Sequence, residues 1–293
     1  MAILWKPESR ELHLYNEQIS YIITILPDGS PGLAWFGRRL SPDVCWTRLV
    51  RFEGRGLSTH TPGLPDEFCR DYAPQEYPTP GRGDFRFPAL ELETEETFPL
   101  LLNLRYRDHR ISRGKPLLPE LPVTYCEDDS EAETLILVLE DRNSQIQVEL
   151  YYSIFTAYPV ISRRAVIYNG GTVPLRVRRS YSAVVDLENS SWNLIHFSGA
   201  WARERHPICR PLAPGLQSIG STRGTSSAQH NPSVLLASPE TTETTGDVYG
   251  ALLVYSGNFR IDVEVGSHGN TRLGIGINRH HYPRRPVRLP QNG

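Results

Sequence analysis

The sequence lacks any run of apolar residues long enough to cross a membrane. None of its hydrophobic stretches approaches the roughly 20 residues that a membrane helix needs, and acidic residues come too early in the chain for a secretory signal peptide. The formal net charge is −2, so no basic excess favours nucleic acid or an anionic lipid surface. We therefore expect a cytoplasmic protein that binds neither nucleic acid nor membranes.

Cysteine is also scarce. The four cysteines, at positions 45, 69, 126 and 209, are scattered and form no Cys-x-x-Cys pair, so we expect reduced thiols and no disulfide framework. The adjacent histidines at positions 280 and 281 lack the spacing of zinc ligands. No metal site is expected.

Helical periodicity is absent as well, and no alternation of strands and helices is present that could build a (β/α) barrel. Instead, short stretches rich in β-branched and aromatic residues alternate with turn signals, such as those at residues 27–29 and 169–171. This pattern predicts an all-β antiparallel sandwich. The predicted strands lie within 12–36 and at 89–93, 99–105, 122–127, 133–140, 145–155, 159–168, 173–186, 233–237, 248–255, 259–265 and 271–277.

Two stretches interrupt this rhythm. Residues 37–88 show no sustained period and are interpreted as a long excursion across a sheet edge. Residues 196–227 are interrupted by glycines and prolines and are predicted to be a loop, yet they carry Trp201, four arginines, a glutamate and two histidines. A long loop with such side chains is more often functional than a simple connection. An indole face together with Arg and Glu groups suits a sugar.

Several long motifs, in the same order, resemble bacterial α-galactosidases of the large, multidomain, retaining type, of the glycoside hydrolase family 36 kind. The resemblance runs from about residue 11 to residue 278. The motifs are QEYPTPGRGDFRFPA (75–89), HRISRGKPLLPELPVTYCEDDSEAETL (109–135), YPVISRRA (158–165), SGAWARERH (198–206), RPLAPGLQSIGSTRGTSS (210–227) and GDVYGALLVYSGNF (246–259).

The resemblance implies that residues 1–278 form the N-terminal β-domain of such an enzyme, a two-sheet antiparallel β-supersandwich. The family hydrolyses terminal α-D-galactosyl residues of raffinose-type oligosaccharides with retention, using two aspartates of a (β/α) barrel that this chain does not contain. No cofactor is implied. The chain alone is therefore expected to be inactive, with a barrel as its partner in cis or in trans. The basic, proline-rich tail 279–293 departs from the family pattern and is interpreted as a truncation or a slip of reading frame.

In the family, a tryptophan at the position of Trp201 lies on a loop that helps to wall a sugar pocket, so Trp201 is the principal candidate for substrate binding. Arg203, Glu204 and His206 are further candidates, with a mutual ion-pair network around them as the alternative. Asp84 either contacts substrate or caps its own turn. The acidic run 127–131 is predicted to be a solvated turn. No residue of this chain is assigned a catalytic role.

Two other functions stay open. The chain could serve as a stand-alone, non-catalytic carbohydrate-binding or assembly module, which needs no barrel. It could also resemble aldose mutarotases, which need a histidine and a glutamate facing each other in the concave sheet, here His196 and Glu204. Enzymes of the resembled family are generally tetramers, so a homo-oligomer is expected.

Overall fold

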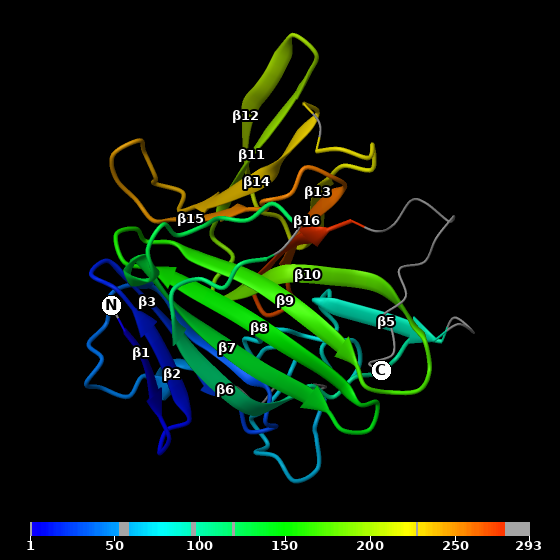
Figure 1. The fold of residues 1–293 in the computed structure, drawn as a ribbon. Helices are drawn as coiled ribbons and strands as arrows, with labels where there is room; N and C mark the ends of the chain where they lie inside the picture. The colour runs from blue at the N-terminus through cyan, green and yellow to red at the C-terminus, as the bar shows by residue number, and fades with distance from the viewer. Residues whose placement is uncertain (1, 53–58, 95–97, 119–120, 227, 279–293) are drawn as a thin grey trace.

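The computed structural model describes residues 2–52, 59–94, 98–118, 121–226 and 228–278, and within them it consists of antiparallel β-sheets (Figure 1). The all-β antiparallel prediction is confirmed. The strands are β1 (Ala2–Lys6), β2 (Glu11–Tyr15), β3 (Ile19–Ile25), β4 (Pro31–Arg38), β5 (Leu90–Thr94), β6 (Arg105–Arg113), β7 (Ala132–Asp141), β8 (Ile146–Phe155), β9 (Ile161–Asn169), β10 (Leu175–Leu187), β11 (Asn193–Ala200), β12 (Arg203–Pro211), β13 (Gly215–Gly220), β14 (His230–Ala237), β15 (Val248–Leu252), β16 (Phe259–Val265) and β17 (Thr271–Ile277). Single 3₁₀ turns lie at Thr47–Leu49 (η1) and Asp129–Glu131 (η2).

The first half of the chain builds two sheets that enclose the larger hydrophobic core. Their strand orders are β1-β2-β3-β4 and β6-β7-β8-β9. The residues that β7 and β8 contribute to this core, such as Leu135, Leu137 and Leu150, alternate along each strand, because successive side chains point to opposite faces of a sheet. These side chains pack against Leu12 and Leu14 of β2 in the same core. The alternation that predicted these strands therefore also fixes which face of each sheet is buried.

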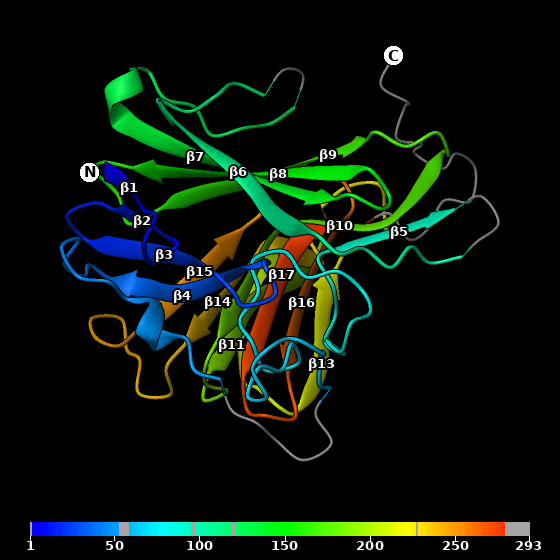
Figure 2. The same ribbon diagram turned by 90° about the horizontal axis from the view of Figure 1, so that it is seen from below.

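The sheets β13-β16-β17-β10-β5 and β12-β11-β14-β15 surround a second core, and all their strands except β5 come from the second half of the chain. Phe259 and Ile261 of β16 pack there with Leu194 and Val234 of the other sheet. The long strand β10 serves both cores, contributing Val184 to the first and residue 187 to the second. In Figures 1 and 2 the sheets of the second half lie against those of the first, and the β11–β12 hairpin projects at the top of Figure 1.

Several strands differ from the sequence prediction. No strand occurs at 122–127, and residues 99–104 contain only an isolated bridge between Glu93 and Pro99, so those two predictions are wrong. The strands β1 and β6 were not predicted. Both lie at sheet edges, and most of the side chains of β6 are exposed, so this strand carries polar residues on both faces and shows no alternation.

The glycine-rich signal at 169–171 behaves in part as predicted. The chain turns there, with Asn169 Oδ1 accepting from the Gly171 N–H at 3.1 Å. However, β9 and β10 enter different sheets instead of pairing as a hairpin. The turn at 27–29 does join a paired hairpin, β3–β4, with Gly29 at φ +86° and Ser30 bonded to the Asp28 carboxylate.

One network of buried ion pairs joins β10, β17 and the segment before β5. Arg272 is fully buried and lies opposite Asp186 in the β10–β17 ladder, with an Nε–Oδ1 distance of 2.7 Å. Its Nη1 lies 2.9 Å from Asp84 Oδ2, and Arg86 bridges the same two aspartates at 2.9 and 3.3 Å. Burial alone would raise the pKa of Asp186, but Arg272 and Arg86 outweigh it and lower that pKa.

A second network lies between the two sheets of the first half. Glu76 accepts hydrogen bonds from Tyr21 of β3 at 2.8 Å and from Tyr152 of β8 at 2.7 Å, and it pairs with Arg163 of β9 at 3.0 Å. Burial raises the pKa of Glu76, against the opposing effect of Arg163. The predicted excursion 37–88 therefore supplies, in its second part, the charged groups that join sheets in both networks.

No helix among the described residues is long and apolar enough to span a bilayer. All four cysteines are free. The tail 279–293, singled out in the sequence, lies outside the described residues.

Candidate functional site

The stretch predicted to be a loop, 196–227, is instead largely strand, so that prediction is wrong. Strands β11 and β12 form a hairpin with a two-residue turn at Trp201 and Ala202, and β13 follows in a different sheet. The nine residues of β12 are all exposed, and the strand lies at the outer edge of its sheet. An edge strand tolerates the prolines 207 and 211, because it has backbone donors that no ladder uses. Exposure on both faces removed the alternation by which a strand is recognised.

The tip of the hairpin has a defined backbone geometry. Ala202 adopts φ +61°, and its N–H donates to Glu204 Oε1 at 2.9 Å, which holds the turn. Gly199 lies close to the facing strand: a Cβ there would meet the Arg203 carbonyl oxygen at 2.3 Å. The hairpin therefore requires glycine at position 199.

Replacing Gly199 by alanine is expected to lower the free energy of unfolding by about 1–3 kcal/mol, the usual cost of forcing an atom into a close-packed contact. Urea unfolding of the purified chain would measure this, and amide hydrogen exchange should locate the opening in β11 and β12. Gly250→Ala in the same sheet is the matched control, because its added Cβ would meet only the end of the flexible Leu235 side chain at 3.3 Å. Equal stability of the two variants would contradict the close approach seen in the hairpin.

Trp201 occupies the turn itself and is 91% exposed, which places a large apolar ring in solvent at the end of a projecting hairpin (Figure 1). Single exposed apolar side chains are common on protein surfaces, and Phe85 of this chain is 78% exposed as well, so it is the place of Trp201 at the tip of the hairpin that makes it available to a ligand or a partner. The ring has no packing role within the described chain, and its position depends only on the turn.

The charged residues beside Trp201 do not form the ion-pair network considered as their alternative role. Arg203, Arg205 and His206 are exposed, and within the described residues none of them forms an ion pair. Glu204 is engaged by the turn backbone. The tip therefore presents an indole ring with exposed arginine and histidine side chains close to it in the sequence.

Asp84 lies elsewhere, in the buried network under β10 and β17. Only 7% of its surface is exposed, and its carboxylate is occupied by Arg86 and Arg272. Its Oδ1 also accepts from the Arg86 N–H at 3.1 Å, which is the hydrogen bond that an aspartate capping its own turn makes. The structure does not bring Asp84 together with the residues of the hairpin tip.

The histidine and glutamate needed for mutarotase chemistry do not face each other. His196 is buried on β11 and pairs with Ile208, whereas Glu204 is exposed at the turn. Burial, together with Arg210 and His230, lowers the pKa of His196. His196 lies beside His230, with ring centroids 6.0 Å apart. We therefore assign His196 a packing role between the strands.

The acidic run 127–131 forms the exposed turn that was predicted. Asp128 and Glu131 make a reciprocal capping box around η2, which satisfies the turn's own backbone N–H groups. Among the described residues, no group of three or more His, Cys, Asp or Glu side chains is arranged to hold a metal ion.

Comparison with known proteins agrees with the motifs. Residues 29–284 match the family described as the glycosyl hydrolase family 36 N-terminal domain. The chain is 37% identical over 278 residues to α-galactosidase AgaA of Geobacillus stearothermophilus, which covers 95% of this chain and 38% of that protein. It is 34% identical to the bifunctional α-galactosidase/sucrose kinase AgaSK of Mediterraneibacter gnavus, covering 95% of this chain and 30% of that protein.

Solved structures give the same result. The family 36 α-galactosidase AgaB of Geobacillus stearothermophilus is similar with a TM-score of 0.89 at 38% identity, over 95% of this chain and 38% of that one. The galactosidase domain of AgaSK is similar with a TM-score of 0.93 at 33% identity, over all of this chain and 40% of that one. The 293 residues thus span well under half the length of these relatives. The chain belongs to glycosyl hydrolase family 36 and corresponds to its N-terminal domain.

Proposed function

We propose that this chain works as the non-catalytic N-terminal part of an α-galactosidase that releases terminal α-D-galactosyl residues from raffinose-type oligosaccharides with retention. Its own contribution is the β11–β12 hairpin, which brings Trp201 to the substrate pocket, with Arg203, Glu204 and His206 beside it. The observation that carries the proposal is the 91% exposure of Trp201 at a turn of defined geometry. Such a ring suits the apolar C–H face of a pyranose.

The substrate class rests on relatives. Variants of AgaA have been crystallised with raffinose and with stachyose, and this chain is similar to AgaA over more than nine-tenths of its length. Retaining hydrolysis needs two carboxyl groups about 5–5.5 Å apart, which we assign to a (β/α) barrel in cis or in trans. No cofactor enters this mechanism. For Asp84 we propose a structural role in the buried network instead of substrate contact.

We further propose that residues 1–278 form one domain in which the four sheets pair as the two layers of a β-supersandwich. The two cores and the shared strand β10 support this arrangement. Four free thiols support a reducing, cytoplasmic setting.

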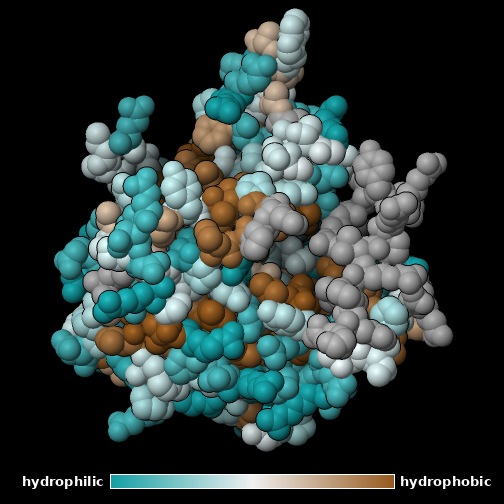
Figure 3. Space-filling model, viewed as in Figure 1, coloured by the Kyte–Doolittle hydropathy of each residue, from teal (hydrophilic) through white to brown (hydrophobic). Residues whose placement is uncertain are grey.

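A homo-oligomer, on the family pattern a tetramer, is part of the same proposal. The strand β12 leaves its outer edge without a partner strand in the described chain, and open edges favour association. Exposed apolar side chains, among them Leu117, Leu121, Leu252 and Val254, also suit a covering barrel or subunit. Figure 3 shows apolar surface gathered near the middle of the face viewed there, within a mainly polar surround.

Changing Trp201 to alanine tests the function. Residues 1–278 would be joined to the remaining part of AgaB, and hydrolysis of raffinose would be followed. We expect KM to rise about 5- to 150-fold with a smaller change in kcat, because loss of an aromatic contact removes about 1–3 kcal/mol of binding. Phe85→Ala, which removes an aromatic ring that is 78% exposed in another part of the domain, is the matched control.

Unchanged KM and kcat in the Trp201 variant would refute the pocket role and leave the chain as a stand-alone carbohydrate-binding or assembly module. Loss of the oligomer in light scattering, with KM restored at high protein concentration, would assign the indole to a subunit interface instead.

A further inference from the structure

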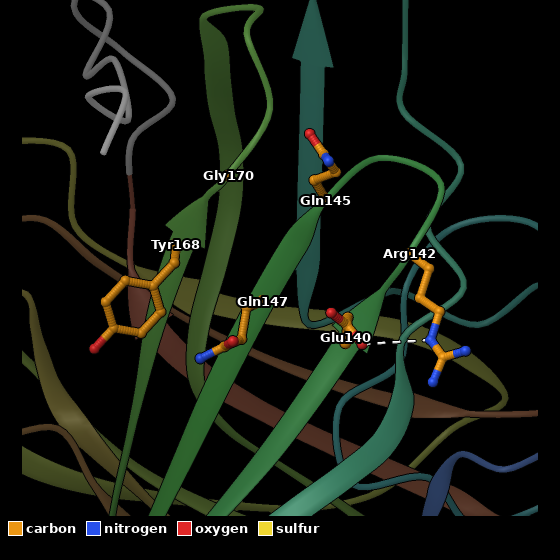
Figure 4. A pocket seen from close by; sticks show the side chains of 6 residues that line it. All are labelled: Glu140, Arg142, Gln145, Gln147, Tyr168 and Gly170. Atoms are coloured by element: carbon orange, nitrogen blue, oxygen red, sulfur yellow. Dashed lines mark ion pairs between the residues drawn. The ribbon is translucent and has the colours of Figure 1, made fainter. Parts of the chain in front are cut away.

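A polar hollow lies away from the hairpin, at the end of the β6–β9 sheet where β7 turns into β8 (Figure 4). Its volume is about 420 Å³, within the range of small-molecule sites. It is lined by Glu140, Arg142, Gln145, Gln147, Tyr168 and Gly170, which come from β7, the following turn, β8 and the end of β9. None of these residues belongs to the hairpin that carries Trp201.

The walls of the hollow are held in place by contacts beneath and beside them. The Tyr168 hydroxyl donates to Glu149 Oε2 at 3.4 Å. Glu149 is only 6% exposed and is itself fixed by Tyr151 at 2.9 Å and Arg110 at 2.6 Å. The Tyr168 hydroxyl is thus held by Glu149, and the aromatic ring lines the hollow.

The turn side is equally constrained. Gln145 adopts φ +57°, and its carbonyl oxygen accepts from the Gly170 N–H at 3.0 Å. A Cβ at position 170 would meet that carbonyl oxygen at 2.9 Å, so glycine allows the turn to close against the end of β9. A side chain at position 170 would push the two apart.

The chemistry of the lining favours a neutral, hydroxyl-rich ligand. The only carboxylate among the lining residues, Glu140, is occupied by Arg142 at 3.5 Å and by Arg107 at 3.2 Å, which leaves no free acidic group for a cation. Arg107 also donates to Gln147 Oε1 at 3.3 Å, which orients that amide with its N–H₂ group as the remaining donor. Two amides and one aromatic ring offer donors, acceptors and an apolar face, which together match a pyranose.

We propose that this hollow is a second carbohydrate-binding site, in which a neutral oligosaccharide packs on Tyr168 and hydrogen-bonds to Gln145 and Gln147. The site acts apart from the substrate pocket and does not depend on the role proposed for Trp201. It would hold an oligosaccharide chain to the enzyme while another part of the molecule acts on its end.

The test is a titration of the ¹⁵N-labelled 293-residue chain with stachyose, followed by two-dimensional NMR. We expect saturable shifts confined to residues around the β7–β8 turn and the end of β9. Tyr168→Ala and Gln147→Ala should each weaken binding about tenfold, whereas Tyr168→Phe should retain it because the ring face remains. Tyr125→Ala, which removes a tyrosine ring that is 69% exposed elsewhere, is the matched control and should leave binding unchanged.

Three outcomes would overturn the proposal. One is the absence of saturable NMR shifts at the hollow when folded wild-type chain is titrated with stachyose. Another is binding that Trp201→Ala abolishes and Tyr168→Ala spares, which would leave the function proposed for the hairpin standing. The third is displacement of stachyose by inorganic phosphate, which would identify an anion site built on Arg107 and Arg142. Conversely, if Trp201→Ala leaves KM and kcat unchanged, the NMR shifts expected at Tyr168 are not affected.

Discussion

An Arg272→Met variant is expected to lose about 3–5 kcal/mol of unfolding free energy, because removing one partner of a buried ion pair leaves the other charge without compensation. Arg272 is fully buried and contacts both Asp186 and Asp84. Methionine fills a similar volume without the charge. Urea denaturation of the purified chain near neutral pH would measure the loss.

Arg203→Met, a change of the same kind on an exposed strand, is the control and should alter the unfolding free energy by less than about 0.5 kcal/mol. A loss at Arg272 no larger than that of the control would show that the network contributes little to stability.

The same network sets an acid dependence. The folded-state pKa of Asp186 lies below its unfolded value of about 3.9, because Arg272 and Arg86 favour the charged form against burial. Its stabilisation is therefore complete above that unfolded value and is lost as pH falls through the lower folded value. The unfolding free energy of the wild-type chain should therefore fall on acidification. That of Arg272→Met should fall less, because Arg272 no longer holds down the pKa of Asp186 in the folded state.

An Arg163→Met variant is expected to be destabilised by a similar amount, about 3–5 kcal/mol, for the same physical reason. It would leave Glu76, which is 1% exposed, between the two tyrosine hydroxyls without its cation. Because Glu76 lies between the β3 and β8 layers, the loss should appear in the cooperative unfolding of the whole domain.

The contribution of Glu76 to stability should depend on pH with the opposite sign to that of Asp186. Burial already raises the pKa of Glu76, and loss of Arg163 removes an opposing effect. An acid with a raised folded pKa contributes its stability below its unfolded value, about 4.3, and loses it as pH rises through the folded value. The deficit of Arg163→Met relative to wild type should therefore shrink on going from neutral pH towards about pH 5.

The double variant Arg163→Met with Glu76→Gln provides the control for that pH effect, because it removes the titrating acid together with its cation. If the pH-dependent part of the deficit persists in the double variant, Glu76 is not its source.

Sequence reasoning correctly predicted strands whose core residues alternate along the chain, such as β7 and β8, and also strands that are buried along nearly their whole length, such as β3 and β17. In β7 and β8 the alternation is visible in the sequence because every second side chain faces the first core. The strands β6 and β12 lie at sheet edges with most or all of their side chains exposed, so no periodic signal exists to be read. For this reason β12 was predicted to be part of a loop.

The candidate site was predictable to a similar extent. The sequence singled out Trp201, and the structure adds that a tight hairpin turn holds it in solvent. The residues lining the hollow at the β7–β8 turn were not singled out, because a tyrosine, two glutamines and a glycine in separate strands form no recognisable motif. Gln145 has a positive φ, which its residue type does not reveal.

The sequence by itself determined that this chain is all-β and that it belongs with the N-terminal domains of family 36, and it singled out Trp201 as the candidate for sugar contact. These properties follow from side-chain alternation and from contiguous motifs, both of which are local along the chain. Only the tertiary structure decided that Asp84 is buried beside Arg272, 188 positions later, and that Glu76 joins two sheets. Those partners are brought together by the packing of sheets, and the charge of a residue does not reveal whether an opposite charge will meet it there.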